Sequence, residues 1–448
     1  MPMPRRSLCL LLLAANGVYH ANLRPLSSGD SLPAALIPIS LMTGHGVSLD
    51  GLGPWVREHV PGAFYVVERR GRYFSAYPPA TGVIAAPFYA PPVLALGVLR
   101  WDPGAQVTFA RIWEKFVAAF LASAAVVLML LLLERLVRPP WAWGLTLLFA
   151  FGTNVWATAS QALWQHTPGV LAAVACLYCL VRALEEGAAP LWAVGAGICA
   201  GAAVLIRPTN VTLCAGAGAA LVWRGGWRAA FGFAVPAAAG CILGAAYNLA
   251  VFGTLWGGWT EGLTNPLLPG LAGILLSPGR GLLIYCPAAA FALAGAFAAG
   301  VRERAIALGC GVFIAGQLLV VAKWPVWFGG YCWGPRLLTE IAPAAIVLLA
   351  LGTGVLDRSP LLRRALLAAA VWCVFIQALG TFCYPKGHWD HTPRPVDTDR
   401  AWDWTDNPIV RTVRGGVAWE PYAILYTRLT RGPAAAAAVM QQLGIAPF

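Results

Sequence analysis

The sequence predicts an all-α integral membrane protein, a bundle of about eleven transmembrane helices. The first observation is composition: 59% of the 448 residues are hydrophobic, 11% are charged, and the mean hydropathy is +0.67. The second is length, because many stretches approach the roughly 20 apolar residues that cross a hydrocarbon core about 30 Å thick. The third is that short loops with Arg, Gly or Pro separate these stretches. A globular enzyme with one anchor is therefore excluded.

The predicted spans follow one another closely, and the charges between them indicate how the bundle is oriented. Short loops on one side carry about three times as many cations as those on the other, which places the cation-rich side in the cytoplasm. The net charge of +12 therefore encodes topology and not nucleic-acid binding. The predicted spans are 7–23, 113–134, 140–159, 167–184, 189–206, 209–223, 229–251, 282–300, 304–322, 337–356 and 362–383. The cations of the inner loops are Arg5, Arg6, Arg135, Arg138, Arg182, Arg224, Arg228, Arg302, Arg304, Arg358, Arg363 and Arg364. The cations of the outer loops are Arg207, Arg280, Lys323 and Arg336.

Two outer pieces complete the predicted architecture, which divides into a membrane domain (1–383) and an extracytoplasmic tail (384–448). The first outer loop, about 24–112, is expected to hold a membrane-skimming juxtamembrane helix at 32–42 and a hairpin that turns near Arg70 and Gly71. The apolar segment Tyr77–Leu99 contains five prolines, which we expect to break a helix there. We therefore place it as a re-entrant or interfacial element. Arg5 and Arg6 precede an uncleaved first helix, for which a signal peptide is the alternative.

Asp30 is the leading candidate for chemistry, because it directly follows the first span in "RPLSSGDSLPAALIPISL". One interpretation makes it the N-cap of the next helix, since Asp accepts hydrogen bonds from free backbone N–H groups. The other makes it a general base at the membrane surface. Asp50, in "SLDGLG", is a weaker candidate whose alternative is a turn residue.

Several motifs spread over nearly the whole chain resemble a known superfamily. The pattern is similar to the C-type (GT-C) polytopic membrane glycosyltransferases, which include protein O-mannosyltransferases and aminoarabinose transferases, and within them to a bacterial branch. Asp30 after the first helix carries the resemblance together with "YPPATGVIAAPFYAPP", "LWQHTP", "LIRPTN", "LLSPGRGLLIYCP", "GGYCWGPRLLTEIAP" and "WDWTDNPIVR".

The resemblance implies a role for Asp30 as the catalytic base or as a metal-binding carboxylate. Several relatives have two adjacent acids at this position, whereas Ser31 follows Asp30 here. Relatives with a divalent metal combine the first-loop acid with a histidine elsewhere, so Asp30 and His166 are the pair expected to hold a metal if one is bound. The alternative for His166 is a hydrogen-bonded structural residue.

Transfer of a sugar from a polyprenyl-phosphate donor releases a phosphate, so the site needs cations as well as a base. The outer cations are the candidates. Arg280 in "SPGRG" either contacts a phosphate or anchors at the headgroups, and the same alternatives hold for Lys323. Arg207 in "LIRPTN" precedes a helix-breaking proline and suits either use. Arg336 and Glu340 stand four residues apart, so we expect them to pair on one helix face.

That pair leaves two alternatives open. Either it neutralises itself at the membrane surface, or Arg336 binds a phosphate while Glu340 holds it in place. In the tail, His388 and His391 flank Asp390 without a helix to align them for a metal. The tail tryptophans serve either sugar stacking or the membrane interface; they are Trp389, Trp402, Trp404 and Trp419.

The predicted function is an inverting hexosyl or pentosyl transfer from a polyprenyl-phosphate donor to a glycan, lipid or protein acceptor on the extracytoplasmic face of a bacterial inner membrane. Asp30 is the expected general base. A transporter or flippase for such lipids is one alternative, although the sequence lacks a convincing internal repeat. A non-catalytic partner in cell-envelope glycan synthesis is another.

Overall fold

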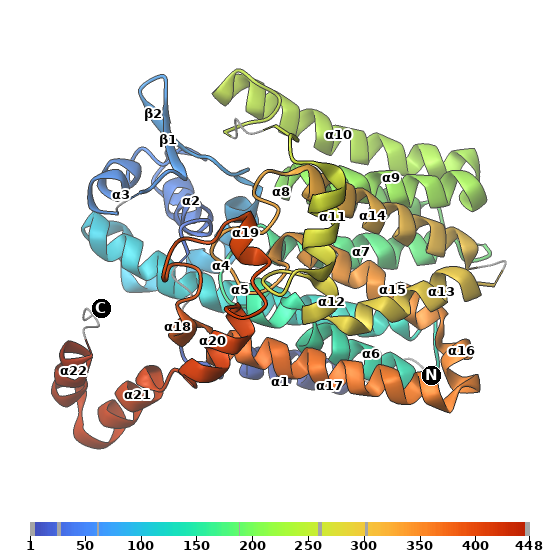
Figure 1. The fold of residues 1–448 in the computed structure, drawn as a ribbon. Coiled ribbons are helices and arrows are strands. Elements are labelled where there is room, and N and C mark those ends of the chain that lie inside the picture. The colour runs from blue at the N-terminus through green and yellow to red at the C-terminus, as the bar shows by residue number, and fades with distance from the viewer. Residues whose placement is uncertain are drawn as a thin grey trace.

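The computed structural model describes residues 5–443 except 25–27, 61, 188, 259–261 and 301–302. It is 73% helical with a single two-stranded sheet (Figure 1). The elements are α1 (Arg5–His20), α2 (Leu32–Met42), α3 (Gly53–His59), β1 (Val66–Arg69), β2 (Arg72–Ser75), α4 (Ala80–Leu96), α5 (Pro103–Leu133), α6 (Pro139–Gly152), α7 (His166–Ala183), α8 (Leu191–Ile206), α9 (Val211–Ala220), α10 (Gly226–Phe252), α11 (Leu267–Leu276), α12 (Leu282–Tyr285), α13 (Ala292–Ala298), α14 (Arg304–Lys323), α15 (Ala342–Leu351), α16 (Thr353–Arg358), α17 (Pro360–Phe382), α18 (Tyr384–Gly387), α19 (Thr398–Ala401), α20 (Pro408–Gly415), α21 (Glu420–Arg431) and α22 (Pro433–Gln442).

Long apolar helices dominate the described chain. Five helical stretches are long and apolar enough to cross a membrane: α5, α7, the run 208–252 that includes α9 and α10, α14 and α17. Shorter apolar helices of 10 to 17 residues include α2, α4, α8 and α11. The polytopic all-α class is therefore confirmed, and the number of spans stays a prediction.

Two predicted spans differ in detail from the helices. The span 113–134 lies within α5, which begins ten residues earlier because Asp102 caps it by accepting from the Ala105 N–H at 3.0 Å. Its 31 residues extend roughly 46 Å at about 1.5 Å each, so α5 outreaches the hydrocarbon core. The span 282–300 is divided into α12, a 3₁₀ segment from Pro287 and α13, because Pro287 has no N–H to continue a helix.

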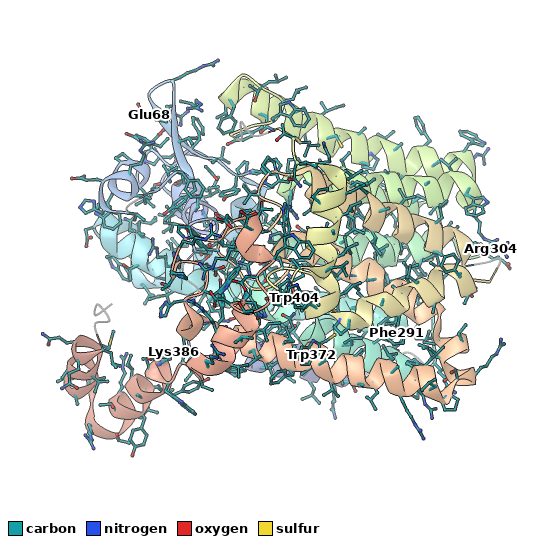
Figure 2. All side chains as sticks on the ribbon, viewed as in Figure 1. Glu68, Phe291, Arg304, Trp372, Lys386 and Trp404 are labelled. Atoms are coloured by element: carbon teal, nitrogen blue, oxygen red, sulfur yellow. The ribbon has the colours of Figure 1, made fainter. Side chains whose placement is uncertain are left out.

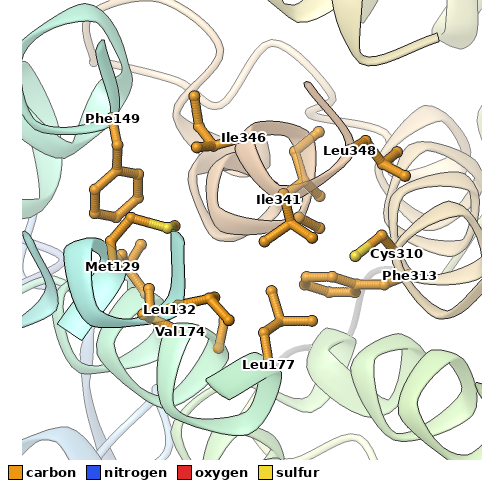
Figure 3. Close-up of a cluster of buried hydrophobic side chains, with 14 of the residues drawn as sticks. Met129, Leu132, Phe149, Val174, Leu177, Cys310, Phe313, Ile341, Ile346 and Leu348 are labelled. Carbon is orange, nitrogen blue, oxygen red and sulfur yellow. The ribbon is translucent and has the colours of Figure 1, made fainter. Parts of the chain in front are cut away.

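Small residues let the helices pack closely. Gly197 and Gly201 stand on one face of α8 against α10, and a Cβ on Gly201 would come within 2.7 Å of the Pro236 carbonyl oxygen. A Cβ on Gly240 would come within 2.5 Å of the Gly201 Cα. Without a hydrophobic drive between helices in lipid, such close backbone contact is what holds a pair together. A buried apolar cluster fills the centre of the bundle; Figure 3 shows Met129, Leu132, Phe149, Val174, Leu177, Cys310, Phe313, Ile341, Ile346 and Leu348.

The elements of the predicted first outer loop gather at one end of the bundle, which we call the hairpin end (Figure 1). The predicted helix 32–42 and the hairpin turn are confirmed: α2 spans those residues, and Arg70 and Gly71 turn with positive φ angles of 52° and 71°. The expectation that prolines break the Tyr77–Leu99 segment is wrong. Helix α4 runs through Pro87, Pro91 and Pro92 and packs along α2, and membrane helices tolerate internal prolines.

The amino terminus and α16 lie at the opposite end of the bundle from the hairpin (Figure 1). Figure 2 places Arg304 at that opposite end and Glu68 and Lys386 at the hairpin end. The tail helices α18 to α22 follow α17 at the hairpin end, and α21 and α22 extend away from the bundle. Residues predicted on the two sides of the membrane are thus separated along the bundle axis.

Candidate active site

Asp30 lies in the turn between α1 and α2, at the hairpin end. Ser31, and not Asp30, occupies the N-cap position of α2, and no side-chain cap hydrogen bond is made there. The Asp30 carboxylate instead accepts two hydrogen bonds from distant parts of the chain. Tyr77 Oη donates to Oδ1 at 2.5 Å, and Arg336 Nη1 donates to Oδ2 at 2.6 Å. The side chain stays 23% exposed, so both partners leave it open to one side.

Tyr77 is held as a hydrogen-bond donor by its surroundings. Burial and the adjacent Asp30 carboxylate raise the pKa of Tyr77, so the phenol keeps its proton. The residue lies two positions after the end of β2, and its backbone N–H donates to Ser75 Oγ at 3.0 Å. The hairpin therefore positions the phenol over Asp30.

Arg336 contacts three separate segments of the chain, those of Asp30, Gly329 and Trp164. Its Nη2 donates to the Gly329 carbonyl at 2.8 Å, and its guanidinium lies over the Trp164 ring, 4.1 Å from the centroid. Burial lowers the pKa of Arg336, but the Asp30 carboxylate outweighs it and the net shift is upward. Arg336 and Asp30 therefore form a charged pair, stacked on an indole that a cation favours.

The predicted pairing of Arg336 with Glu340 is wrong. Both residues lie in a 3₁₀ helix (Arg336–Ile341), where about three residues make a turn, so positions four apart face different directions. Glu340 Oε2 instead accepts from His166 Nδ1 at 2.9 Å and from Arg207 Nη1 at 2.8 Å. All three side chains are buried, which makes this a polar cluster that joins α7, the end of α8 and the 3₁₀ helix.

Arg280 is buried and fully engaged in the loop before α12. It donates to the carbonyls of Phe328 and Gly330, each at 2.9 Å, and to Asp390 Oδ1 at 2.5 Å. Trp389 lies beneath the guanidinium with its ring centroid 5.2 Å away. Arg280 and Arg336 thus hold consecutive carbonyls of one loop, and Arg280 ties that loop to the tail. Its phosphate role stays a prediction.

The remaining candidates lie apart from this cluster of contacts. Asp50 accepts from Ser48, from Arg72 at 2.8 Å and from the Tyr73 N–H at 2.7 Å, so it anchors β2 as a turn residue does. These partners outweigh burial and lower its pKa. Lys323 ends α14, and its carbonyl accepts from the Asn265 N–H at 3.0 Å. No hydrogen bond or ion pair of its ammonium is found within the described part of the chain.

A metal site does not fit this arrangement. Among the described residues no group of three or more His, Cys, Asp or Glu side chains is placed to hold a metal ion. Asp30 is engaged by a cation and a phenol, and His166 by Glu340.

Three contacts of the candidate site were not predicted from the sequence: those of Tyr77, Trp164 and Asp390. Tyr77 opens "YPPATG" and Trp164 lies in "LWQHTP", both of them motifs that carried the superfamily resemblance. The motifs were thus found without the role of these side chains. Asp390 was considered only as a neighbour of His388 and His391, because nothing local links it to a loop 110 residues earlier.

The arrangement defines a class: a polytopic membrane protein whose active-site candidate lies at one end of the bundle. No protein-family model and no curated protein matches the sequence. Among solved structures, ArnT from Cupriavidus metallidurans bound to undecaprenyl phosphate is similar over 98% of this chain and 75% of its own, with a TM-score of 0.56 and 14% identity. AglB from Archaeoglobus fulgidus, in complex with an inhibitory peptide and a dolichol-phosphate, is similar over 99% of this chain and 60% of its own, with a TM-score of 0.46 and 13% identity.

ArnT is a GT-C glycosyltransferase, the superfamily that the motifs resemble. The chain has a fold similar to that of the ArnT structure. At 14% identity the similarity concerns the fold, and what the site does is argued from its own geometry.

Proposed function

We propose that this protein is an inverting membrane glycosyltransferase that moves one sugar from a polyprenyl-phosphate donor to an acceptor on the extracytoplasmic face. The observation that carries the proposal is the pairing of Asp30 with Arg336, a base and a cation 306 residues apart in the chain. Such a charged pair is costly to desolvate at a membrane surface, so a chemical use accounts for its presence. The fold shared with lipid-phosphate enzymes supports the same reaction class.

In the proposed reaction Asp30 removes the proton of the acceptor hydroxyl as that oxygen attacks the anomeric carbon. A new bond forms between the acceptor oxygen and the carbon, the bond from this carbon to the phosphate oxygen breaks, and the phosphate leaves with the electron pair. Attack opposite the leaving group inverts the configuration. Arg336 is the cation proposed to stabilise the departing phosphate, since its positive charge already stands beside the base.

The other predicted residues receive supporting roles. Lys323 is proposed as a second phosphate contact. Arg280 and Arg207 are proposed as further phosphate contacts, and each already pairs with a carboxylate, as Arg336 does. Glu340 is proposed to hold Arg207 in place through their hydrogen bond. His166, the first residue of α7, is proposed to tie the start of that helix to Glu340.

The decisive experiment replaces Asp30 with Asn, which keeps the shape of the side chain and removes its basicity. We expect sugar transfer to fall by a factor of about 10² or more, the usual effect of losing a general base, while expression and membrane insertion persist. Asp50→Asn is the matched control, because that carboxylate is also at the hairpin end and anchors a strand. Normal product from Asp30→Asn would contradict the role of Asp30 as general base, and absence of transfer in the wild type as well would favour a non-catalytic partner.

A second readout separates the transporter alternative. The same purified variants are reconstituted in vesicles with labelled polyprenyl-phosphate sugar, and both transfer and movement of the lipid between leaflets are followed. Lipid movement that survives in Asp30→Asn without any transfer in the wild type would indicate a flippase.

A further inference from the structure

An apolar groove lies at the hairpin end of α17, away from the contacts of Asp30. It encloses about 440 Å³ between the last turns of α17 and the segment that leads into α21. None of its lining residues is a partner of Asp30 or Arg336. The lining consists of Phe375, Ala378, Leu379, Phe382, Cys383, Val417, Trp419 and Tyr422.

The side chains at this groove suit the edge of a bilayer. Phe375 is 47% exposed on α17, and Trp419 is 66% exposed at the opposite wall. Tyr422 Oη donates to the Ala21 carbonyl at 2.8 Å, which ties the start of α21 to the end of α1. Aromatic residues with one polar edge are typical of the level where hydrocarbon meets headgroups.

Arg24 borders this groove and is half-buried. Its Nη2 donates to the Thr381 carbonyl at 3.4 Å, and the groove residues Cys383 and Tyr422 are among its electrostatic neighbours. A guanidinium at the rim of an apolar groove is complementary to an anion carried on a hydrocarbon chain.

Lys115 adds a second cation behind Arg24. It is 4% exposed, its Nζ donates to Gln161 Oε1 at 2.5 Å, and Arg24 is its charged neighbour. No carboxylate contacts Lys115 within the described part of the chain. A buried ammonium held only by an amide is expensive, and a bound anion would compensate it.

One carboxylate stands near this positive cluster. Glu420 is an electrostatic neighbour of Arg24, but it is already bonded to Lys386. Counting Arg24 and Lys386 against Glu420 leaves one positive charge in excess, and Lys115 adds a buried basic group. His20, whose ring contacts Phe116, is a basic residue and adds no negative charge to this cluster.

We propose that this groove binds an anionic membrane phospholipid. One acyl chain lies along Phe375, Ala378 and Phe382 of α17, and the headgroup phosphate faces Arg24, with Lys115 behind it. This site goes beyond the proposed transferase reaction, because the lipid is a resident ligand and not the donor. It would neutralise the buried cations and fix α21 against α1.

The test uses the full-length protein, delipidated in detergent and titrated with phosphatidylglycerol, phosphatidylcholine or inorganic phosphate while native mass spectrometry counts bound ligands. We expect phosphatidylglycerol to bind at least tenfold more tightly than phosphatidylcholine. Arg24→Gln removes the charge, and Ala378→Trp fills the groove with Arg24 intact; each should remove that preference. Arg431→Gln and Leu367→Trp, at exposed positions of α21 and α17 outside the groove, should keep it.

Other outcomes overturn the proposal. Equal binding of the two phospholipids, or an unchanged preference in Ala378→Trp, would show that no such site exists. Competition by inorganic phosphate alone at similar concentration would indicate an anion site without a lipid chain. Displacement of phosphatidylglycerol by an equal concentration of polyprenyl phosphate would assign the groove to the donor instead. Sugar transfer measured in parallel separates all of these from a failure of the transferase proposal.

Discussion

At the level of single residues, the carboxylates of this protein differ by what surrounds them. Asp30 has one cationic and one phenolic partner and keeps 23% of its side chain exposed. Glu340 has two cationic or potentially cationic partners and is 1% exposed. A base must meet its substrate, whereas a buried carboxylate between two partners can only hold them. Accessibility therefore separates the carboxylate proposed as the catalytic base from the structural carboxylate.

Tyr77→Phe tests how the Asp30 carboxylate is positioned. The change removes the hydrogen bond to Oδ1 and leaves the Arg336 contact in place. A hydrogen bond to a charged group contributes about 1.5–3 kcal/mol, so we expect the transfer rate to fall by about tenfold or more. Initial rates with saturating donor measure it. Tyr73→Phe, four residues earlier in β2 of the same hairpin, is the control, and an equal loss there would mean that only the hairpin had been disturbed.

At the level of elements, the Glu340 cluster joins three helices through one carboxylate. Removing it leaves Arg207 buried without its partner, and breaking a buried pair costs about 3–5 kcal/mol. Glu340→Ala should therefore lower the free energy of unfolding by that order. The exposed pair Arg138–Asp357 offers the control, because Asp357→Ala should cost less than about 1 kcal/mol. Unfolding in mixed micelles compares both variants, and equal losses would contradict the assignment.

The contact of α8 with α10 rests on glycine. In Gly201→Ala the new methyl group would meet backbone atoms of α10 at 2.7 Å, whereas in Gly244→Ala it would meet a Leu205 methyl at an ordinary 3.5 Å. Overpacking of this kind costs about 1–3 kcal/mol. We expect a clear fall in the midpoint of thermal unfolding for Gly201→Ala and little change for Gly244→Ala. Similar midpoints would show that the helices separate easily.

At the scale of the whole molecule, the two ends of the bundle are predicted to lie on opposite sides of the membrane. In a cysteine-free background, Arg70→Cys at the hairpin turn should react with an impermeant maleimide on intact cells whose outer envelope is opened. Arg363→Cys at the start of α17 should react only after the inner membrane is made permeable. The reverse pattern would invert the topology and place Asp30 in the cytoplasm, away from the proposed acceptor.

Much of the fold was predictable because lipid imposes simple rules. Apolar length predicted the helical bundle, and α2 and the hairpin were placed correctly since a proline-rich start and an Arg-Gly turn act locally. The prolines of α4 misled, because a helix tolerates them when a neighbour such as α2 packs against it. The count of spans and the topology remain predictions.

The site was predicted only as a set of residue types. Asp30, Arg336 and the buried histidine were all chosen from the sequence, but their partners were not, since Arg336 was assigned to Glu340 four residues away. Sequence spacing predicts contacts within a regular helix, and here a 3₁₀ turn redirected both side chains. Tyr77, Trp164 and Asp390 each contact a residue far away in the chain: Asp30, Arg336 and Arg280, respectively.

By itself, then, the sequence determined that this protein is built for lipid, that it is helical, and which acidic and basic residues are available for a site, because hydropathy and charge are properties of the chain. Which carboxylate meets which cation was decided by the tertiary structure alone. Ion pairs are short-range and depend on where helices end in space. Asp30 therefore pairs with Arg336, Glu340 with Arg207, and Arg280 with Asp390.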